Sequence, residues 1–204
     1  LGMQGKYQQV EEYAIIAAEM YETLGKSQAV CRIKVNLAMS YNLAGEHEKA
    51  LAALHEAEAL VLSHKYPLPM QYQLYINLGF AETYLGQRDW SNAEKSILSV
   101  IKSEETKFMA DAYRVMGDIL LGRGEWITAE QWIQQAIEMT DREENGNLYI
   151  GGYAWRSLAS IYAKTGKFQE AKAAKVRAIE IFTEIHLPHE VEKTMALTEL
   201  PPEK

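Results

Sequence analysis

Between residues 113 and 137, large and very small apolar residues recur three or four positions apart on both sides of a glycine. The positions are Tyr113, Met116, Gly117, Leu120, Gly124, Trp126, Ala129, Ile133 and Ala136. This spacing is typical of two amphipathic helices joined by a tight turn. We expect the helices to cross where Gly117 faces Ala129, because these small side chains let two backbones approach closely. The residues expected around this contact are Tyr113, Leu120 and Trp126.

The same spacing returns four more times along the 204 residues, which predicts an all-α repeat protein. We expect one repeat domain over residues 1–200, followed by a tail at 201–204. The parts of this domain are a half repeat at 1–26, full repeats at 27–66, 67–105, 106–146 and 147–187, and a capping segment at 188–200.

The first repeat is predicted to hold only its second helix, over residues 8–24. Leu1 stands four residues before the turn glycine, where a first helix would end, and no methionine begins the chain. We therefore expect the sequence to be cut from a longer protein. A missing helix leaves apolar surface bare in a stack of repeats. The residues expected to be partly exposed, or covered by another copy, are Val10, Ala14 and Ala17.

The second repeat opens at Ser27, which is predicted to cap the first helix of that repeat. The third repeat departs from the spacing of the others. Residues 77–79 (Asn-Leu-Gly) resemble residues 36–38 (Asn-Leu-Ala), but Trp90 follows Gly86 by four positions instead of two. Either the turn holds two extra residues, or the phase of the first helix slips.

The last full repeat is predicted to end the stack. Lys175 occupies the position of Ile133 and Leu54 in earlier repeats, so the last helix should present a wetter outer face, as terminal repeats require. We expect Pro188 to end this helix, and a short helix over residues 189–197 to cover the open end.

These positions carry a family resemblance. The order of large apolar residue, Leu-Gly or Leu-Ala, Tyr, Gly-x-aromatic, Ala and Ala is similar to the tetratricopeptide repeat, over nearly the whole chain. The residues at the aromatic position are Tyr7, His47, Trp90, Trp126 and Phe168. They lie 36 to 43 residues apart, whereas the family norm is about 34. Repeats of this length resemble those of bacterial signalling regulators and kinesin-light-chain-type proteins.

The resemblance implies a right-handed superhelix whose first helices line a concave groove for peptides or partner helices. By helical phase, the residues six, ten and thirteen positions before each turn glycine point into this groove. They are Arg32, Val35 and Met39 in the second repeat, Asp111, Arg114 and Asp118 in the fourth, and Tyr153, Arg156 and Ser160 in the fifth. For the third repeat, the two alternatives are Tyr75, Leu78 and Glu82, or Gln73, Ile76 and Phe80. The candidate ligand-binding set is Arg32, Tyr75, Asp111, Arg114, Asp118, Tyr153, Arg156 and Ser160.

Two features of this set bear on the ligand. The co-chaperone branch of the family clamps a terminal carboxylate with Lys and Asn, whereas Val35 and Met39 stand at such places here and argue against chaperone-tail binding. Arg114 has an aspartate three residues before it and another four after it, so we expect ion pairs within its own helix. Arg156 has no acidic helical neighbour, so its guanidinium must find water, Asp118 or a ligand oxygen.

The composition of the chain argues against several classes of binding partner. A formal net charge of −7 argues against direct nucleic-acid binding, which needs a basic surface. Cys31 is a single cysteine, so no internal disulfide can form and a reducing, cytoplasmic compartment is the expectation. No apolar run approaches the roughly 20 residues that span a bilayer, so we expect no membrane partner. The expected partner is a peptide or protein, with homo-oligomerisation left open.

Catalytic, metal and cofactor sites are not expected. Asp141, Glu143, Asn145 and Asn147 resemble the start of a calcium loop, but Gly152 stands where a bidentate glutamate is required. The pair formed by His186 and His189 is separated by a proline and would need further zinc ligands. No nucleophile–base pair is evident. The function predicted from sequence is a non-catalytic binding module, the sensor or interaction part of a larger bacterial regulator. The alternative is a self-associating scaffold that holds an attached domain.

Overall fold

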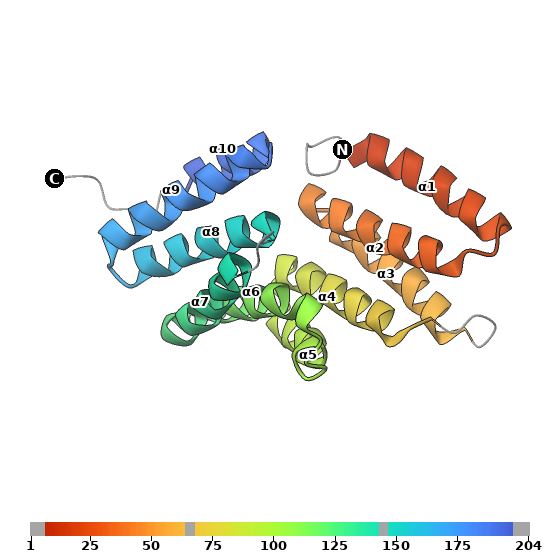
Figure 1. Cartoon of the computed structure of the whole chain (residues 1–204), viewed down its shortest axis with the longest axis horizontal. Helices are drawn as coiled ribbons and strands as arrows, with labels where there is room; N and C mark the ends of the chain where they lie inside the picture. Colours follow the sequence, from red (N-terminus) through yellow and green to blue (C-terminus); the bar gives the residue numbers. More distant parts are fainter. Residues whose placement is uncertain (1–6, 64–67, 143–146, 198–204) are drawn as a thin grey trace. The chain divides into compact units, whose positions relative to one another are not determined.

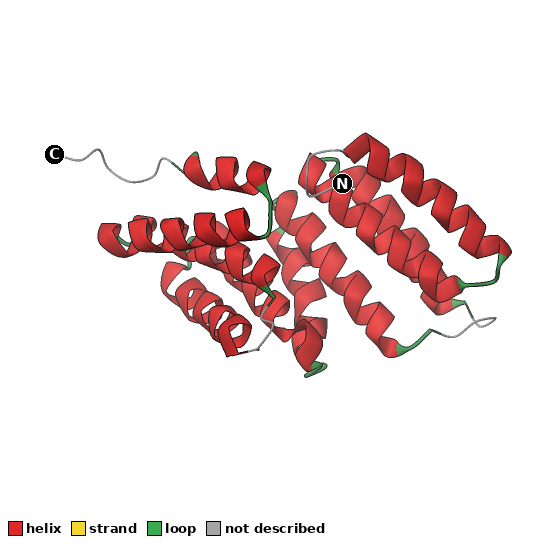
Figure 2. Ribbon diagram, turned by 45° about the horizontal axis from the view of Figure 1, so that its top comes forward, coloured by secondary structure: helices red, strands yellow, loops and turns green. Residues whose placement is uncertain are grey.

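A computed structural model describes residues 7–63, 68–142 and 147–197 of the chain. These residues form helices joined by short turns and contain no strand, so the predicted all-α repeat fold is confirmed (Figure 2). The chain divides into two compact halves, an N-terminal half at Leu1–Ser103 and a C-terminal half at Glu104–Lys204.

The described residues of the N-terminal half form the helices coloured red to light green in Figure 1: α1 (Tyr7–Thr23), α2 (Ser27–Ala44), α3 (His47–Leu62), α4 (Met70–Gly86) and α5 (Trp90–Ile101). The C-terminal half contains α6 (Thr106–Arg123), α7 (Trp126–Arg142), α8 (Leu148–Lys164), α9 (Phe168–Glu184) and α10 (Pro188–Met195). Each helix packs on the next within its half, and the first helices also pack on one another, α2 against α4 and α6 against α8.

Three of the turns within helix pairs are made by a glycine in the left-handed region. Gly45, Gly124 and Gly166 have φ values of 78°, 82° and 77°, a conformation that costs other residues energy. The second helix of each pair begins two residues later. Between α4 and α5 this position is held by Arg88, with φ 60°, two residues before Trp90.

The left-handed turn at Arg88 decides between the two alignments of the third repeat. The turn position is Arg88 and not Gly86, so the phase of the first helix is shifted by two residues. Gly86 is the last residue of α4, and a Cβ atom there would collide with the His47 ring, so packing explains this glycine. The residues that match Leu37 and Ala38 are then Phe80 and Ala81, and the resemblance of residues 77–79 to residues 36–38 was misleading.

The predicted helix crossing in the fourth repeat is confirmed. A Cβ atom on Gly117 would lie 2.6 Å from the Ile133 side chain and 3.3 Å from the Ala129 carbonyl oxygen. The expectation for Trp126 was wrong, since this residue is 38% exposed at the start of α7. Trp132, almost two turns further along α7, supplies the aromatic ring instead, with its centroid 5.2 Å from that of Tyr113.

Two predicted boundary residues also differ from the structure. Ser27 is the first residue of α2 and does not cap it, because the chain leaves α1 through Gly25 and enters α2 directly after Lys26. Pro188 is the first residue of α10 and does not end α9, which stops at Glu184. Proline is well tolerated there because the first helical N–H has no intrahelical partner.

At the C-terminal end, the predicted short helix is confirmed as α10, which packs on α9. Lys175 is half-buried, whereas Ile133 and Leu54 at the equivalent position are fully buried, so this position is the more accessible one, as expected. Lys175 Nζ donates hydrogen bonds to the carbonyl oxygens of Met195 (2.8 Å) and Leu197 (2.9 Å). Lys175 thus satisfies carbonyls at the end of α10 that lack intrahelical partners.

At the other end, Val10, Ala14 and Ala17 are half-buried, as expected. Larger apolar side chains of α1 are more exposed than these three. The predicted end of a preceding helix at residues 1–5 lies outside the described residues.

Candidate functional site

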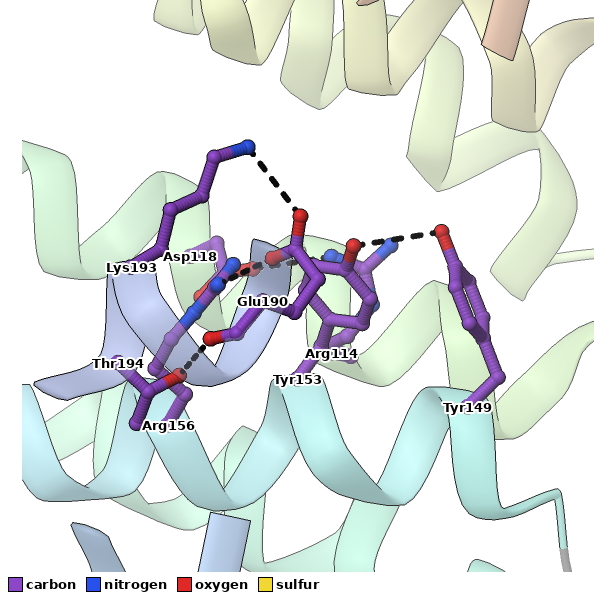
Figure 3. A network of polar contacts seen from close by, with 8 residues as sticks. All are labelled: Arg114, Asp118, Tyr149, Tyr153, Arg156, Glu190, Lys193 and Thr194. Atoms are coloured by element: carbon purple, nitrogen blue, oxygen red, sulfur yellow. Dashed lines mark hydrogen bonds and ion pairs between the residues drawn. The ribbon is translucent and has the colours of Figure 1, made fainter. Parts of the chain in front are cut away.

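The C-terminal half gathers most of the predicted ligand-binding residues on its two first helices. We define the first-helix face as the side of α6 and α8 that carries Asp111, Arg114, Asp118, Tyr153, Arg156 and Ser160. Helix α10 reaches this face through its polar side chains, and Figure 3 shows the resulting network.

Arg114 is paired within α6, as predicted. Its Nε donates to Asp111 Oδ1 at 2.8 Å, and its Nη1 donates to Asp118 Oδ2 at 3.1 Å. Arg114 is buried, and two carboxylates i−3 and i+4 on the same helix supply the compensating charge that a buried guanidinium requires.

Arg156 has a partner that the sequence did not identify. Its Nη1 donates to Glu190 Oε2 of α10 at 2.6 Å, and Lys193 Nζ donates to Glu190 Oε1 at 3.2 Å. The Glu190 side chain is only 4% exposed, whereas that of Arg156 is 24% exposed. Burial opposes ionisation of Glu190, but the charges of Arg156 and Lys193 outweigh burial, and the pKa of this carboxyl is lowered.

Tyr153 lies between the two arginines. The guanidinium carbon of Arg156 is 4.6 Å from the centre of the Tyr153 ring, and that of Arg114 is 5.7 Å away. The hydroxyl of Tyr149, one turn earlier, donates to the Tyr153 hydroxyl at 3.5 Å. Burial, together with the Glu190 charge, raises the pKa of Tyr153 to about 12, so the hydroxyl stays protonated.

The Asp118 carboxyl interacts with polar groups on both α6 and α8. Burial raises the pKa of its carboxyl, against the opposing effects of the Arg114 charge, a hydrogen bond from Ser157 and the Arg156 charge. Ser160 contributes less than expected, because its hydroxyl donates back to the Arg156 carbonyl oxygen at 3.3 Å. Acidic and basic groups alternate in this network, in the order Asp111, Arg114, Asp118, Arg156 and Glu190.

The N-terminal half brings fewer predicted residues together. The Tyr75 hydroxyl donates to Asn36 Oδ1 at 2.6 Å and contacts Met39 Sδ at 3.7 Å, which places these three on one surface of α2 and α4. Arg32 is exposed. The groove position given to Val35 was wrong, since it is fully buried in the core with Cys31 and Ala38.

The slipped phase of the third repeat selects the set Tyr75, Leu78 and Glu82. In the rejected set, Ile76 and Phe80 are buried residues of the core cluster. Leu78 is itself buried, so Tyr75 and Glu82 are the members of the selected set with exposed surface.

A pocket of about 320 Å³ opens between α3, α4 and α5. Phe80 and Tyr84 form its aromatic side, with ring centroids 6.1 Å apart, and the His55 ring lies 5.0 Å from that of Phe80. Its polar lining includes Asn77 and Lys95. Sequence reasoning missed this pocket because its residues come from three helices that do not share one spacing.

Comparison with known families agrees with the helical repeat fold. A tetratricopeptide repeat model matches residues 108–188, which span α6 to α9, and a second tetratricopeptide repeat model matches residues 32–56. The chain belongs to the tetratricopeptide repeat family. A search of curated proteins found no match. Tetratricopeptide repeats typically mediate protein–protein interactions and are typically non-catalytic.

Within the described part of this tetratricopeptide repeat chain, no group of three or more His, Cys, Asp or Glu residues could hold a metal ion. The calcium-loop resemblance falls partly at residues 143–146, outside the described residues. Cys31 is a packed thiol, and burial raises its pKa to about 11. No described helix is both long and apolar enough to cross a membrane.

Proposed function

We propose that the chain binds a peptide or a helix of a partner protein on the first-helix face. One observation carries the proposal. The Arg156 guanidinium is stacked on Tyr153 at 4.6 Å and tied to Glu190 at 2.6 Å, while 24% of its side chain remains exposed. A guanidinium has five N–H donors, and the bond to Glu190 uses one of them.

Such an arrangement suits a binding surface for two physical reasons. Arginine and tyrosine are enriched among the residues that contribute most to protein interfaces. In addition, a side chain that is already held in place loses little conformational entropy when a partner binds. Arg156 is held by Tyr153 on one side and Glu190 on the other, so it presents oriented donors to a peptide carbonyl or carboxylate.

A phage-displayed peptide library, selected against the whole chain, tests this proposal. Hydrogen–deuterium exchange with the strongest peptide then shows which helices it protects. We expect added protection in α6 and α8. Protection confined to α7 and α9, or failure to enrich any peptide sequence, would contradict the proposal.

We further propose that this module is the sensor or interaction part of a bacterial regulatory protein and acts in the cytoplasm. The support is the spacing of 36 to 43 residues between the repeat aromatics and the single, buried cysteine. The gene sequence preceding the codon for Leu1 tests the regulatory role. A DNA-binding or ATPase domain encoded there would support the role, and a gene that encodes only repeats would oppose it.

Self-association as a scaffold is the second candidate function, favoured by the exposed apolar residues of α1. Sedimentation velocity distinguishes it from the first. A mass that rises with protein concentration supports the scaffold, and a constant mass opposes it.

A further inference from the structure

The complete helix pairs show which side of a second helix contacts its first helix. In α7, six residues after its first residue, Trp132 stacks on Tyr113 of α6. In α3, Glu56 lies nine residues after the first residue and pairs with Lys34 of α2 at 2.5 Å. Ala57 lies ten residues after it, and its carbonyl oxygen is 4.0 Å from Cys31 Sγ of α2. The fourth position comes from α9.

In α9, fourteen residues after its first residue, the Phe182 ring meets the Tyr153 ring of α8 with centroids 5.2 Å apart. The positions at +6, +9, +10 and +14 of a second helix therefore contact a first helix, beside the +3 and +7 positions at which Ala129 and Ile133 of α7 meet Gly117 of α6. Three different helix pairs define it, so it belongs to the repeat and not to one pair.

In α1 these four positions are held by apolar residues that remain accessible. We name them the α1 seam; they are Tyr13, Ile16, Ala17 and Tyr21. Tyr13 is 63% exposed, Ile16 54% and Tyr21 42%, and the neighbouring Met20 is 61% exposed. At the position of Tyr13, Ala53 of α3 and Ala174 of α9 are buried.

The adjoining side of α1 is already used. Val10 and Ala14 pack against the core of the N-terminal half, and Ala18 is buried. The α1 seam is therefore an exposed apolar surface at positions that contact a first helix in the complete pairs. Exposed apolar surfaces of this kind are typical of interaction sites.

The charges next to the α1 seam indicate the chemistry of its occupant. Helix α1 carries four glutamates and no Lys, Arg or His. Two of them, Glu12 and Glu19, are exposed and lie one turn before and one turn after Ile16, on the same edge of the seam. In α3, the position that Ile16 holds in α1 is taken by Glu56, which pairs with a basic residue of its first helix, Lys34.

We propose that the α1 seam binds an amphipathic helix with basic residues beside its apolar stripe, in the position that a first helix takes in the complete pairs. This site shares no residue with the first-helix face, so either site can fail without the other. A second copy of α1 would bring Glu12 and Glu19 close to the same glutamates, and like charges oppose such a pairing.

The chain supplies a suitable probe in its own α2. A synthetic peptide of residues 27–44 has two basic residues, Arg32 and Lys34, and no acidic residue. The test uses this peptide with Cys31→Ser, a fluorescent label and a staple on its solvent-facing side to hold it helical. Fluorescence anisotropy measures its binding to the whole chain. We expect saturable binding that weakens as salt is added.

Two variants give the decisive comparison. Ile16→Glu changes an exposed residue of the seam and should weaken binding tenfold or more. Val176→Glu changes a similarly exposed residue on α9 and should leave binding unchanged. The peptide with Arg32→Glu and Lys34→Glu should bind more weakly than the parent peptide. Circular dichroism verifies that both protein variants remain folded.

Three outcomes would overturn the proposal. They are the absence of saturable binding by the stapled peptide, equal affinity for the wild type and Ile16→Glu, and a dimer of the chain that Ile16→Glu dissociates. The last result would assign the seam to a second copy instead of a basic helix.

Discussion

Arg156 of α8 donates a 2.6 Å hydrogen bond to Glu190 of α10, and this ion pair ties the short last helix to a first helix 34 residues earlier. The pair has a second consequence. The hydrogen-bond partner of Arg156 was expected to be water, Asp118 or a ligand oxygen, and it is instead Glu190. Arg156 is therefore both a structural residue and an exposed one, and experiments must separate these roles.

Replacing Glu190 with Gln should lower the free energy of unfolding. The substitution leaves Arg156 without its buried counter-charge, and hydrogen bonds to charged groups contribute about 1.5–3 kcal/mol. Because Arg156 is partly exposed, we expect a loss of about 1–2 kcal/mol in urea unfolding. The matched control is Glu180→Gln, whose partner Arg177 is exposed, and it should change stability by less than about 0.5 kcal/mol. Equal effects of the two substitutions would show that burial of Glu190 is unimportant.

The same carboxyl should make stability depend on pH. Its pKa is lowered in the folded chain, below the ordinary value of 4.5. Its contribution is therefore complete above about pH 4.5 and is lost as pH falls through the folded-state pKa. The difference in unfolding free energy between the wild type and Glu190→Gln isolates this contribution from that of Asp118, whose pKa is raised. We expect this difference to shrink between pH 5 and pH 3, and a constant difference would contradict the lowered pKa.

Two adjacent glycines of α8 should respond oppositely to alanine. A Cβ atom on Gly152 would lie 2.7 Å from the Phe182 ring, so Gly152→Ala should lose about 1–3 kcal/mol through overpacking. A Cβ atom on Gly151 would lie 3.5 Å from Thr140, an ordinary contact, so Gly151→Ala should gain up to about 1 kcal/mol of helix propensity. Thermal unfolding of both variants measures this. A stabilised Gly152→Ala would mean that α8 and α9 are not so closely packed there.

Arg88→Gly should stabilise the chain. Arg88 holds a left-handed conformation with φ 60°, which costs a residue with a side chain roughly 1–2 kcal/mol. Part of the gain is offset by the greater freedom of glycine in the unfolded chain, so we expect a net increase of about 0.5–1 kcal/mol. In the reverse change, Gly45→Arg, the added Cβ atom meets no other atom within 4 Å, and the substitution should cost a similar amount. Destabilisation by Arg88→Gly would show that the Arg88 side chain has a role of its own.

The sequence predicted the helices well because their spacing is a local property. The helix expected at residues 8–24 is α1, and the close contact at Gly117 follows from one small residue repeated at one position. The ion pairs of Arg114 were also predicted correctly, since its two aspartates lie about one helical turn away on the same helix.

The errors share a different cause, which is tertiary contact. Periodicity could not show that Trp132 packs on Tyr113 while Trp126 stays exposed, since both are aromatic residues on α7. Gly86 resembled a turn glycine but is small because the His47 ring lies against it. Glu190 and Glu192 both lie in the predicted capping segment. The sequence alone does not show which of them pairs with Arg156, because the answer depends on how α10 is oriented.

The dissociation constant of a library-selected peptide for Arg156→Lys tests the proposed binding face most directly. Lysine keeps the charge that Glu190 requires but lacks the planar fork that stacks on Tyr153 and donates in several directions. We predict at least tenfold weaker binding, equivalent to about 1.4 kcal/mol, with a melting temperature within about 4 °C of the wild type. The matched variant Arg177→Lys on α9 should bind like the wild type. Unchanged peptide affinity in Arg156→Lys would show that Arg156 only fastens α10 to α8, and would contradict a binding role for this face.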